Sequence, residues 1–399
     1  MEDSKKKIVH LCLSSFYIDG YSYQENMLPK YHVKLGYDVT VIASLVSYDK
    51  NGMRCYLKEG EYKCNRDGYK VIRIDYKKGF FRILYKRLRF YSNTYDLLVS
   101  EKPDIIFVHN TSFGDAKYVK KYMKEHPGTF LFADSHADWI NSARNFLSKN
   151  ILHKIIWRHY TQMLLPYYQK VYGVLPIRCD FLYDVYSVPR EKIELLPLGV
   201  DDDAIPSNKE EIKNDIRNKL RIKTTDLVII TGGKIDRLKN THKLMQAFSE
   251  INDEKIHLII FGVVIPDFKE EFDRLLTKNM HYVGWCNSED VINYMVSADL
   301  ACFPGTHSTL WEEAVGLSLP CILKNWEGMH HVDINGNCLF LKDDTVAGIK
   351  EILLKIIKIG LPTGFQQSIV SLSNVIVQSY INVYGASVIA GYSVTIKID

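Results

Sequence analysis

The stretch "DLVIITGGKIDRLKN", residues 226–240, begins as an unbroken apolar run and ends as a basic loop. Unbroken rather than alternating apolarity is typical of a strand that is buried on both faces, as in a parallel sheet between helices. Gly232 and Gly233 let the chain turn tightly where the run ends. The stretch therefore predicts a central parallel strand that leads into a positively charged loop.

Similar apolar runs recur along the chain, and longer helix-like segments separate most of them. Before residue 198 these runs are 8–15, 38–44, 104–110, 129–136 and 170–176. After the opening stretch they are 255–262, 280–285, 298–305, 319–325 and 336–341. This alternation predicts the α/β class, with a doubly wound, Rossmann-like parallel sheet in each half of the chain.

The length of 399 residues exceeds what one hydrophobic core usually covers. We expect a first Rossmann-like domain over 1–198 and a second over 199–360, facing each other across a deep cleft at the carboxyl ends of their strands. The joint is expected near 194–211, where Pro, Gly and an acidic run interrupt the strand pattern. The acidic run, Asp201–Asp203, is expected to be solvated.

Two further segments, 21–36 and 361–399, also allow predictions of secondary structure. The segment 21–36 predicts a helix that ends at a glycine, with one stripe that consists of Gln24, Leu28, Tyr31 and Leu35. Pro29 must kink this helix or mark its true start. The tail 361–399 has only Lys397 and Asp399 as charges, and its β-branched alternation suggests strands of uncertain placement.

The composition favours a cytoplasmic protein without disulfides. No stretch reaches the length of a membrane span, and the apolar run near the start is too short and polar-flanked for a signal peptide. The eight cysteines include no Cys-x-x-Cys pair, so neither a disulfide framework nor a zinc site is indicated.

The charge is distributed unevenly between the halves. Residues 1–198 hold 31 Lys and Arg against 21 Asp and Glu, although the whole chain has a net charge of only +4. The excess is densest in 69–93, where basic and aromatic residues interleave. Such a stretch either lies against an anionic membrane surface or a lipid-linked substrate, or forms a helix that packs by its aromatics with its charges solvated. No nucleic-acid-binding motif accompanies the charge.

The stretch "FPGTHSTLWEEAVGLSLP", 303–320, predicts a strand end, a loop of small polar residues and a helix. On a helical wheel Leu310, Ala314 and Leu317 form the buried stripe, Glu313 lies on the same side, and Glu312 points nearly opposite. The Glu313 carboxylate either accepts hydrogen bonds from ligand hydroxyls or is satisfied by backbone amides or a lysine.

The loop before this helix has a pattern that can bind phosphate. Ser308 or Thr309 is expected to cap the helix, which leaves free backbone N–H groups at the strand's carboxyl end. Lys234 and Lys239, in the loop after the opening strand, are spaced so that both can reach a diphosphate, although a basic surface turn is the alternative.

The order of these elements, from "GGKIDRLKN" through "YVGW" and "ADLACFPG" to "STLWEEAVGLSLPCI" and "NGNCLFL", resembles the nucleotide-sugar-binding domain of family 4 glycosyltransferases, which have the GT-B fold. The resemblance covers 190–342. It extends more loosely to the first domain through "GYDVTVIAS", "KPDIIFVHN" and "PREKIELLPLGVD".

The resemblance implies a set of site residues. It places His136, Lys234, Lys239 and Glu313 in catalysis, with the two lysines on the donor diphosphate, Glu313 on the nucleotide ribose and His136 near the transferred sugar. It implies that the backbone around Trp285 and Cys286 lies against the base. Donor binding is completed by Gly233, Asn240, His307, Ser308, Thr309 and Leu310, and no metal is implied.

The sequence departs from the family pattern at one position that matters. The family usually has a second glutamate eight residues before Glu313, and Gly305 stands there in this chain. His307 is the nearest polar residue able to substitute, and the alternative is that it packs over the loop.

The function implied by the resemblance is a retaining transfer of a sugar from a nucleoside-diphosphate sugar to a hydroxyl. The expected acceptor is a polysaccharide or lipid-linked glycan precursor of the bacterial cell-surface type, reached in the cytoplasm or on the inner face of the membrane. Two alternatives stay open: a nucleotide-sugar epimerase with the same fold, and a catalytically silent sugar-nucleotide-binding or scaffold protein.

Overall fold

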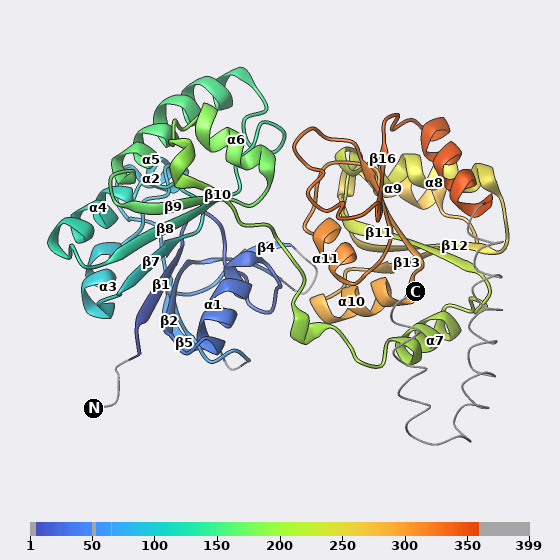
Figure 1. Ribbon diagram of the computed structural model, residues 1–399, viewed down its shortest axis with the longest axis horizontal. Helices are drawn as coiled ribbons and strands as arrows, with labels where there is room; N and C mark the ends of the chain where they lie inside the picture. Colours follow the sequence, from blue (N-terminus) through green and yellow to red (C-terminus); the bar gives the residue numbers. More distant parts are fainter. Residues whose placement is uncertain (1–4, 50–52, 65, 359–399) are drawn as a thin grey trace, which may run out of the picture.

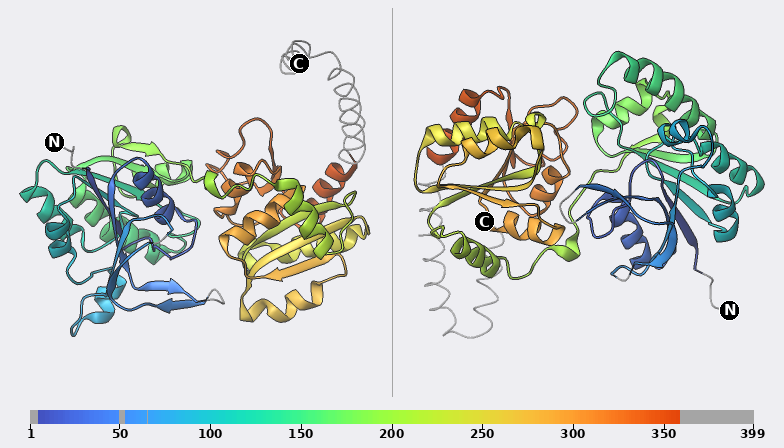
Figure 2. Two further views of the ribbon diagram at one scale, coloured as in Figure 1. Left: turned by 90° about the horizontal axis from the view of Figure 1, so that it is seen from below. Right: turned by 180° about the vertical axis from the view of Figure 1, so that it is seen from behind.

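The computed structural model describes residues 5–49, 53–64 and 66–358 and consists of two α/β units side by side (Figure 1). Helices cover both faces of each sheet (Figure 2). The tail 361–399, for which strands were expected, lies outside the described residues.

The first unit contains an eight-stranded sheet with the order β10-β9-β8-β7-β1-β2-β6-β5. All its pairings are parallel except that of β5 with β6. The strands are β1 (Lys7–Cys12), β2 (Asp38–Ser44), β5 (Gly60–Lys63), β6 (Lys70–Ile74), β7 (Ile105–Val108), β8 (Phe130–Ser135), β9 (Tyr168–Gly173) and β10 (Ile193–Leu195). The helices are α1 (Gln24–Lys34), α2 (Arg82–Arg87), α3 (Thr94–Glu101), α4 (Ala116–Glu125), a π-helix (Ser148–Trp157), α5 (Arg158–Leu164) and α6 (Pro176–Asp184). A separate hairpin joins β3 (Val46–Tyr48) to β4 (Arg54–Tyr56).

The second unit contains a six-stranded, fully parallel sheet with the order β13-β12-β11-β14-β15-β16. Its strands are β11 (Leu227–Ile235), β12 (Ile256–Val264), β13 (Met280–Gly284), β14 (Leu300–Phe303), β15 (Cys321–Lys324) and β16 (Cys338–Leu341). Its helices are α7 (Lys209–Lys219), α8 (Thr241–Ile251), α9 (Pro266–Leu275), α10 (Ser288–Ser297) and α11 (Leu310–Gly316), and residues 346–358 are also helical. Helices α7 and α10 lie on one face of the sheet, and α8 and α9 lie on the other (Figure 1).

The expectation of two doubly wound sheets is confirmed, and Leu227–Ile235 of the opening stretch form the central strand β11. The expected turn at Gly232 and Gly233 was wrong, because both residues lie within this strand and pair with β12. The end of β11 is shaped by glycines. A Cβ on Gly262, whose φ is +113°, would lie 1.9 Å from the carbonyl oxygen of Gly233. Strands β11 and β12 therefore approach closely at their carboxyl ends only because side chains are absent there. In both sheets the strand order changes direction beside the central strand, which is where ligands collect in such folds.

Helix α1 buries polar residues, and the expected stripe is buried only at its start. Gln24, Glu25 and Lys30 are buried, whereas Leu35 is 73% exposed and follows the end of the helix. The expected stripe therefore holds at Gln24 and is wrong at Leu35. A helix that faces a cleft and a linker, instead of a sheet alone, buries polar groups that a periodicity argument cannot anticipate.

The expectation that the acidic run 201–203 is solvated was also wrong for its first member. Asp201 is 4% exposed, and its carboxylate accepts hydrogen bonds from Lys30 Nζ at 2.6 and 2.7 Å. Asp203 lies 2.7 Å from the same ammonium and also pairs with Lys34. These contacts fasten the interdomain linker to α1.

The basic stretch 69–93 is divided between the sheet and the surface. Its first part forms β6, whereas α2 has no buried residue and Phe80 is 98% exposed. The alternative of a helix packed by its aromatics holds only in part, because within α2 Tyr85 is half-buried and meets Phe90 edge-on at 6.0 Å. Within the described residues, no helix is long and apolar enough to cross a membrane. All eight cysteines are free.

We expect Asp201→Asn to lower the free energy of unfolding by about 3 kcal/mol, because it leaves the Lys30 ammonium buried with a weakened partner. Urea unfolding measures this loss. The matched control is Asp202→Asn, which removes an exposed carboxylate one residue away and is expected to leave the stability unchanged. Equal stabilities for the two variants would contradict the fastening role of Asp201.

Candidate functional site

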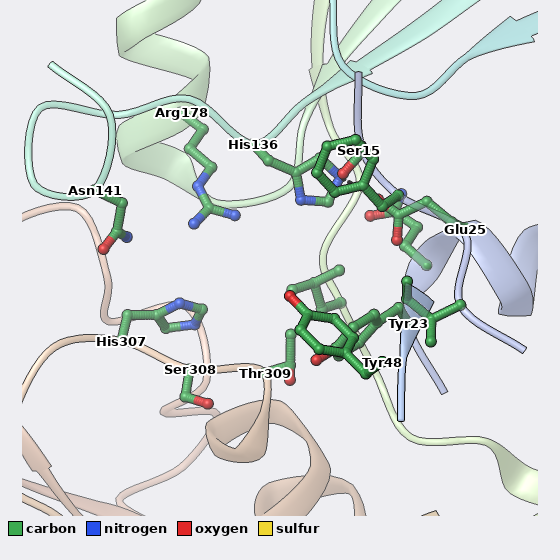
Figure 3. Close-up of a pocket in the computed structure, with 14 residues that line it drawn as sticks. Ser15, Tyr23, Glu25, Tyr48, His136, Asn141, Arg178, His307, Ser308 and Thr309 are labelled. Atoms are coloured by element: carbon green, nitrogen blue, oxygen red, sulfur yellow. Dashed lines mark ion pairs between the residues drawn. The ribbon is translucent and has the colours of Figure 1, made fainter. Parts of the chain in front are cut away.

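A pocket of about 410 Å³ lies between the two units (Figure 3). The first unit and the linker contribute Ser15, Phe16, Ile18, Tyr23, Gln24, Glu25, Tyr48, His136, Asn141, Arg178 and Leu198, and the second contributes His307, Ser308 and Thr309. Most of these residues follow the carboxyl ends of β1, β8 and β14 or begin α1 and α6. The pocket therefore lies where the fold places ligands.

His136 comes from the segment directly after β8 and lines this pocket. Its Nε2 atom is 3.4 Å from Asp134 Oδ1 and 3.8 Å from Glu25 Oε1. Burial alone would lower the pKa of His136, but the charges of Asp134 and Glu25 outweigh burial and raise it. The side chain is thus held toward its cationic form beside the pocket.

Lys239 lies under the loop that follows β14. Its ammonium donates hydrogen bonds to the carbonyl oxygens of Thr306 and His307, each at 2.8 Å. Burial lowers the pKa of Lys239 to about 8. Lys239 and Ser308 also border a second, smaller pocket, which adjoins the first at Ser308.

Lys234 has a different environment. Its side chain is 67% exposed, and the nearest carboxylate is that of Asp236 at 3.4 Å. The structure places it at the end of β11 but not in the wall of either pocket.

The loop after β14 has free backbone donors. Among the described residues, no hydrogen-bond acceptor meets the N–H groups of Ser308, Thr309 and Leu310. The expected side-chain cap is absent, since Thr309 stands at the N-cap without such a bond. Helix α11 has only 7 residues, so these N–H groups act individually more than through a helix dipole.

The buried stripe of Leu310, Ala314 and Leu317 is confirmed, and Glu313 is buried beside it at 9% exposure. In the described chain neither a backbone amide nor a lysine pairs with the Glu313 carboxylate. Burial raises the pKa of Glu313 from 4.5 to about 7. Among the described residues, this buried carboxylate is therefore left without a protein partner.

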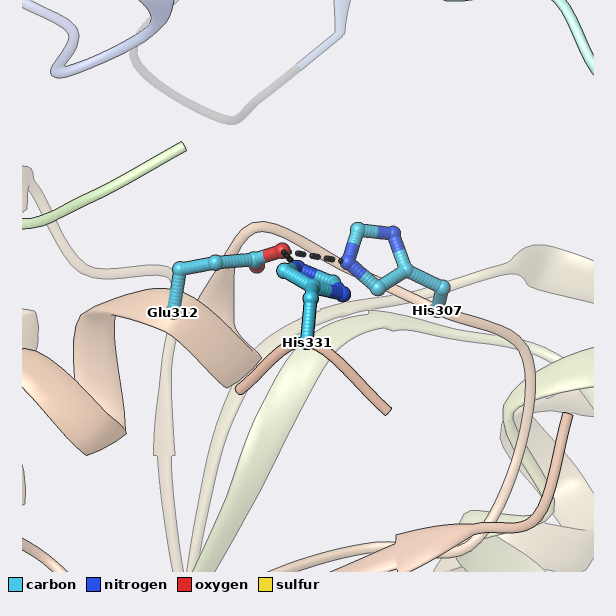
Figure 4. A group of neighbouring side chains, drawn as sticks. All are labelled: His307, Glu312 and His331. Carbon is cyan, nitrogen blue, oxygen red and sulfur yellow. Dashed lines mark hydrogen bonds and ion pairs between the residues drawn. The ribbon is translucent and has the colours of Figure 1, made fainter. Parts of the chain in front are cut away.

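The helical wheel sets Glu312 opposite the buried stripe, but that side of α11 is buried as well. Glu312 is 5% exposed, and its Oε1 accepts hydrogen bonds from His307 Nε2 at 2.8 Å and His331 Nε2 at 2.9 Å (Figure 4). Despite burial, these two imidazoles lower the pKa of Glu312 to about 2. The wheel could not show this burial, because the segment after β15, which carries His331, folds over α11.

Two imidazoles and a carboxylate form a donor set that Zn²⁺ accepts, and their ligating atoms lie within 4.8 Å of one another. Both Nε2 atoms, however, donate to the same carboxylate oxygen, and the Nδ1 atom of His331 is buried without a partner. A ligating histidine ordinarily has a partner for its second nitrogen. We therefore describe these three residues as a hydrogen-bonded triad that holds His307 in the pocket wall.

Gly305 has no room for a side chain. A Cβ at this position would lie 2.3 Å from the carbonyl carbon of Lys239. The loop after β14 thus packs directly on the backbone of the loop after β11, and the glutamate of the family pattern does not fit. His307, two residues on, reaches the pocket instead.

The other expected donor-binding residues lie near the site in different ways. Gly233 has a φ of +103° and packs against Leu310. Asn240 is in the left-handed region at a φ of 54°, and its side chain donates to the carbonyl of Pro304 at 3.0 Å, so it supports the loop. Trp285 is 39% exposed and Cys286 is half-buried after β13, and neither lines the two pockets.

The sequence analysis missed several pocket residues of the first unit: Tyr23, Gln24, Glu25, Asn141 and Arg178. Arg178 is 7% exposed, and its Nε donates to Asp138 Oδ2 at 3.0 Å. Two signals in the sequence could have pointed to these residues. One is the run of polar residues 23–26 at the start of a helix, and the other is an arginine two residues after Pro176.

Comparison with known proteins agrees with this geometry. Residues 27–204 match the model of Glycosyltransferase Family 4, and residues 212–360 match that of Glycosyl transferases group 1. Among curated proteins, no sequence matches the chain.

Solved structures with the same fold share little sequence with this chain. A glycosyltransferase from Rickettsia africae has 16% identity and a TM-score of 0.61, over 92% of both chains. Anabaena HepE in complex with UDP and glucose has 12% identity and a TM-score of 0.62, over 88% of this chain and 90% of the other. An enzyme from Listeria monocytogenes described as a putative UDP-N-acetylglucosamine 2-epimerase has 13% identity and a TM-score of 0.56, over 89% and 88%.

The raised pKa of Glu313 makes stability depend on pH. Because the folded state holds this proton more tightly than the unfolded state, the free energy of unfolding falls as the pH rises from about 4.5 to about 7. We expect Glu313→Gln to gain stability relative to the wild type across this window in urea unfolding. The control Glu289→Gln changes an exposed carboxylate of the same unit and should change the stability much less than Glu313→Gln in this window.

Proposed function

Because this chain is a glycosyltransferase with the GT-B fold, we propose that it transfers a sugar from a nucleoside diphosphate to a hydroxyl group, with retention of the anomeric configuration. The donor diphosphate is assigned to the wall formed by the loops after β11 and β14. The nucleotide ribose is assigned to Glu313 and the transferred sugar to the pocket between His136 and His307.

One observation carries this proposal: the loop after β14 and the start of α11 combine free backbone donors, contact with the half-buried Lys239 ammonium and a Glu313 carboxylate without a protein partner among the described residues. The N–H groups of Ser308, Thr309 and Leu310 have no acceptor in the described chain, and they adjoin the loop that Lys239 holds. Free N–H groups beside a cation suit phosphate oxygens. The Glu313 carboxylate lies one helical turn further on and suits vicinal hydroxyls.

The chemistry of this arrangement is mainly electrostatic. When the bond between the sugar and the diphosphate breaks, its electron pair stays on the phosphate oxygen, and Lys234, Lys239 and the loop N–H groups stabilise the growing negative charge. With retention, the acceptor oxygen attacks the face that the diphosphate leaves, so the acceptor proton passes to the departing phosphate oxygen. The two lysines supply the positive charge, and we propose that no metal ion is required.

His136 is assigned to the sugar rather than to the diphosphate. A cationic imidazole next to the pocket can hydrogen-bond a sugar hydroxyl and orient the donor. His307 faces the same pocket from the second unit, and we assign it the sugar contact that the family pattern gives to a glutamate.

An alternative function has support from Gly305. A chain that lacks the second glutamate, with no room to carry one, is compatible with a protein that binds a nucleotide sugar without transferring it. A GT-B epimerase, in contrast, would convert the donor when no acceptor is present, so product analysis separates these three functions.

The acceptor is proposed to be a lipid-linked or polysaccharide precursor reached at an anionic membrane surface. Phe80 and Ile83 are 98% and 76% exposed, and the cations Lys78 and Arg82 beside them are 72% and 65% exposed. Exposed apolar side chains among basic ones are typical of peripheral contact with anionic lipids. We therefore place the protein in the cytoplasm, with contact to the inner face of the membrane.

We expect Lys234→Ala and Glu313→Ala each to lower kcat/KM for sugar transfer at least about tenfold, equivalent to about 1.4 kcal/mol in the barrier. A thermal-shift screen of uridine, guanosine and adenosine diphosphate sugars first identifies the donor. The control Lys255→Ala removes an exposed lysine at the opposite end of the second sheet and should keep wild-type kinetics. Wild-type rates in the folded Lys234 and Glu313 variants would refute their assigned roles.

Neutralising Lys77, Lys78, Lys86 and Arg87 is expected to weaken cosedimentation with vesicles of phosphatidylcholine and phosphatidylglycerol, since each cation near an anionic surface contributes about 1 kcal/mol. Phe80→Ser combined with Ile83→Ser should weaken it as well. The matched control is Ile334→Ser with Leu339→Ser, which removes exposed apolar side chains of the second unit. Unchanged partitioning of both test variants would leave this stretch as a solvated surface.

A further inference from the structure

A row of histidines crosses the interior of the first unit and ends at His136. His32 Nδ1, on α1, is 2.9 Å from His10 Nε2, in β1, and His10 Nδ1 is 3.0 Å from His109 Nε2. His109 Nδ1 is in turn 2.9 Å from Asp134 Oδ2. The other oxygen of Asp134 is 3.4 Å from His136 Nε2.

This row has no role in the chemistry described so far, and it is costly to bury. His10 and His109 are both 0% exposed. The neighbours of His10 along β1 are Val9 and Leu11, so a third apolar residue would suit the same strand without the desolvation of an imidazole. A buried imidazole requires a hydrogen-bond partner at each ring nitrogen, and His10 has both.

The row can be hydrogen-bonded in only one direction while Asp134 is ionised. A neutral imidazole has one donor and one acceptor nitrogen, and a carboxylate only accepts. His109 therefore donates from Nδ1 to Asp134 and accepts at Nε2 from His10 Nδ1–H. By the same reasoning, His10 accepts at Nε2 from His32 Nδ1–H, so all three rings carry their proton on Nδ1.

The protonation states of the histidines and of Asp134 keep the hydrogen bonds of the row in this direction. Burial and the neighbouring imidazoles lower the pKa of His10, and burial and His109 lower that of His32 to about 4, so both rings are neutral near pH 7. Burial alone would raise the pKa of Asp134, but His109 and His136 together hold it well below its ordinary value. Asp134 Oδ1 also accepts the Asn110 N–H at 2.7 Å.

The other groups that face the row are few. Glu25 and Arg178 lie near His136, with opposite effects on its charge, and the buried Cys12 thiol and Tyr168 hydroxyl lie near Asp134. Phe107 packs against His10 at a ring distance of 5.6 Å, and Tyr37 meets His32 edge-on at 5.9 Å. Within the described residues, the hydrogen bonds that reach Asp134 Oδ2 come from the histidine row alone.

We propose that His32, His10 and His109 are positioning residues, a one-directional donor row that keeps the Asp134 carboxylate ionised and aimed at His136. Hydrogen bonds in such a row polarise one another, so a donor at His32 strengthens the bond that reaches Asp134. The ionised carboxylate then favours the cationic form of His136 in the cleft. Only the use of that cation on a sugar rests on the proposed function; the row and its effect on Asp134 do not.

The direction of the row can be measured without any variant. In protein labelled with ¹⁵N in its histidine rings, two-dimensional ¹H–¹⁵N spectra near pH 7 distinguish Nδ1–H from Nε2–H rings. His10 and His109 are expected to be Nδ1–H, which is the minor form of free histidine in water. An Nε2–H ring at either position would overturn the proposal.

The effect on Asp134 is measured by its ¹³C carboxyl titration in three variants. His32→Leu removes the first donor and is expected to raise the titration midpoint of Asp134 by about one pH unit. His32→Asn keeps an N–H donor at the position of Nδ1 and should restore the wild-type midpoint. His126→Leu is the matched control, because His126 is a half-buried imidazole of the same unit that stacks on Tyr122 at 4.2 Å, outside the row.

A wild-type midpoint in His32→Leu, or a failure of asparagine to restore it, would overturn the proposal. If no donor is turned over by the wild type, while the ring protons and the Asp134 midpoints are as expected, the proposed function fails and this inference stands.

Discussion

The ammonium of Lys239 holds two carbonyl groups of the loop after β14, and the donor side of the cleft depends on that contact. The contact holds the loop after β14 against the backbone of the loop after β11. The two backbones lie so close that residue 305 must be glycine. The same loop carries the N–H groups of residues 308–310, which meet no acceptor among the described residues, and leads into α11, both of whose glutamates are buried. The half-buried Lys239 ammonium thus holds together the loop with free donors and the backbone that leaves no room for a side chain at residue 305.

The two sheets and the buried stripe of α11 could be predicted because parallel strands and amphipathic helices leave a local pattern. The strand at 226–233 and the burial of Glu313 follow from residues within one element. The partners of Glu312 could not be predicted, since His331 reaches it from a segment 19 residues further on. A helical wheel assumes a single buried face, and α11 is covered on two sides.

In the first unit, several polar contacts could likewise not be predicted from the sequence. The burial of the polar residues Glu25, Asn26 and Lys30 in α1 was not predicted from the sequence. Asp201 reads as part of an acidic surface run, yet it pairs with a lysine 171 residues away. The histidine row left no signal at all, because His10, His32 and His109 are unremarkable in their own segments and meet only through the sheet order. Polar contacts between distant segments are fixed by topology, which short-range patterns do not carry.

Because the pKa of Glu313 is about 7, calorimetry can detect the binding of a ligand to this carboxylate. A hydroxyl that donates to this carboxylate favours its charged form, so occupation of the site near pH 7 would expel a proton into the medium. The measured heat would then contain the ionisation enthalpy of the buffer and differ between phosphate and Tris at equal affinity. Proton counting by titration calorimetry would in this way reveal which ligands reach residue 313, even among ligands that bind equally tightly.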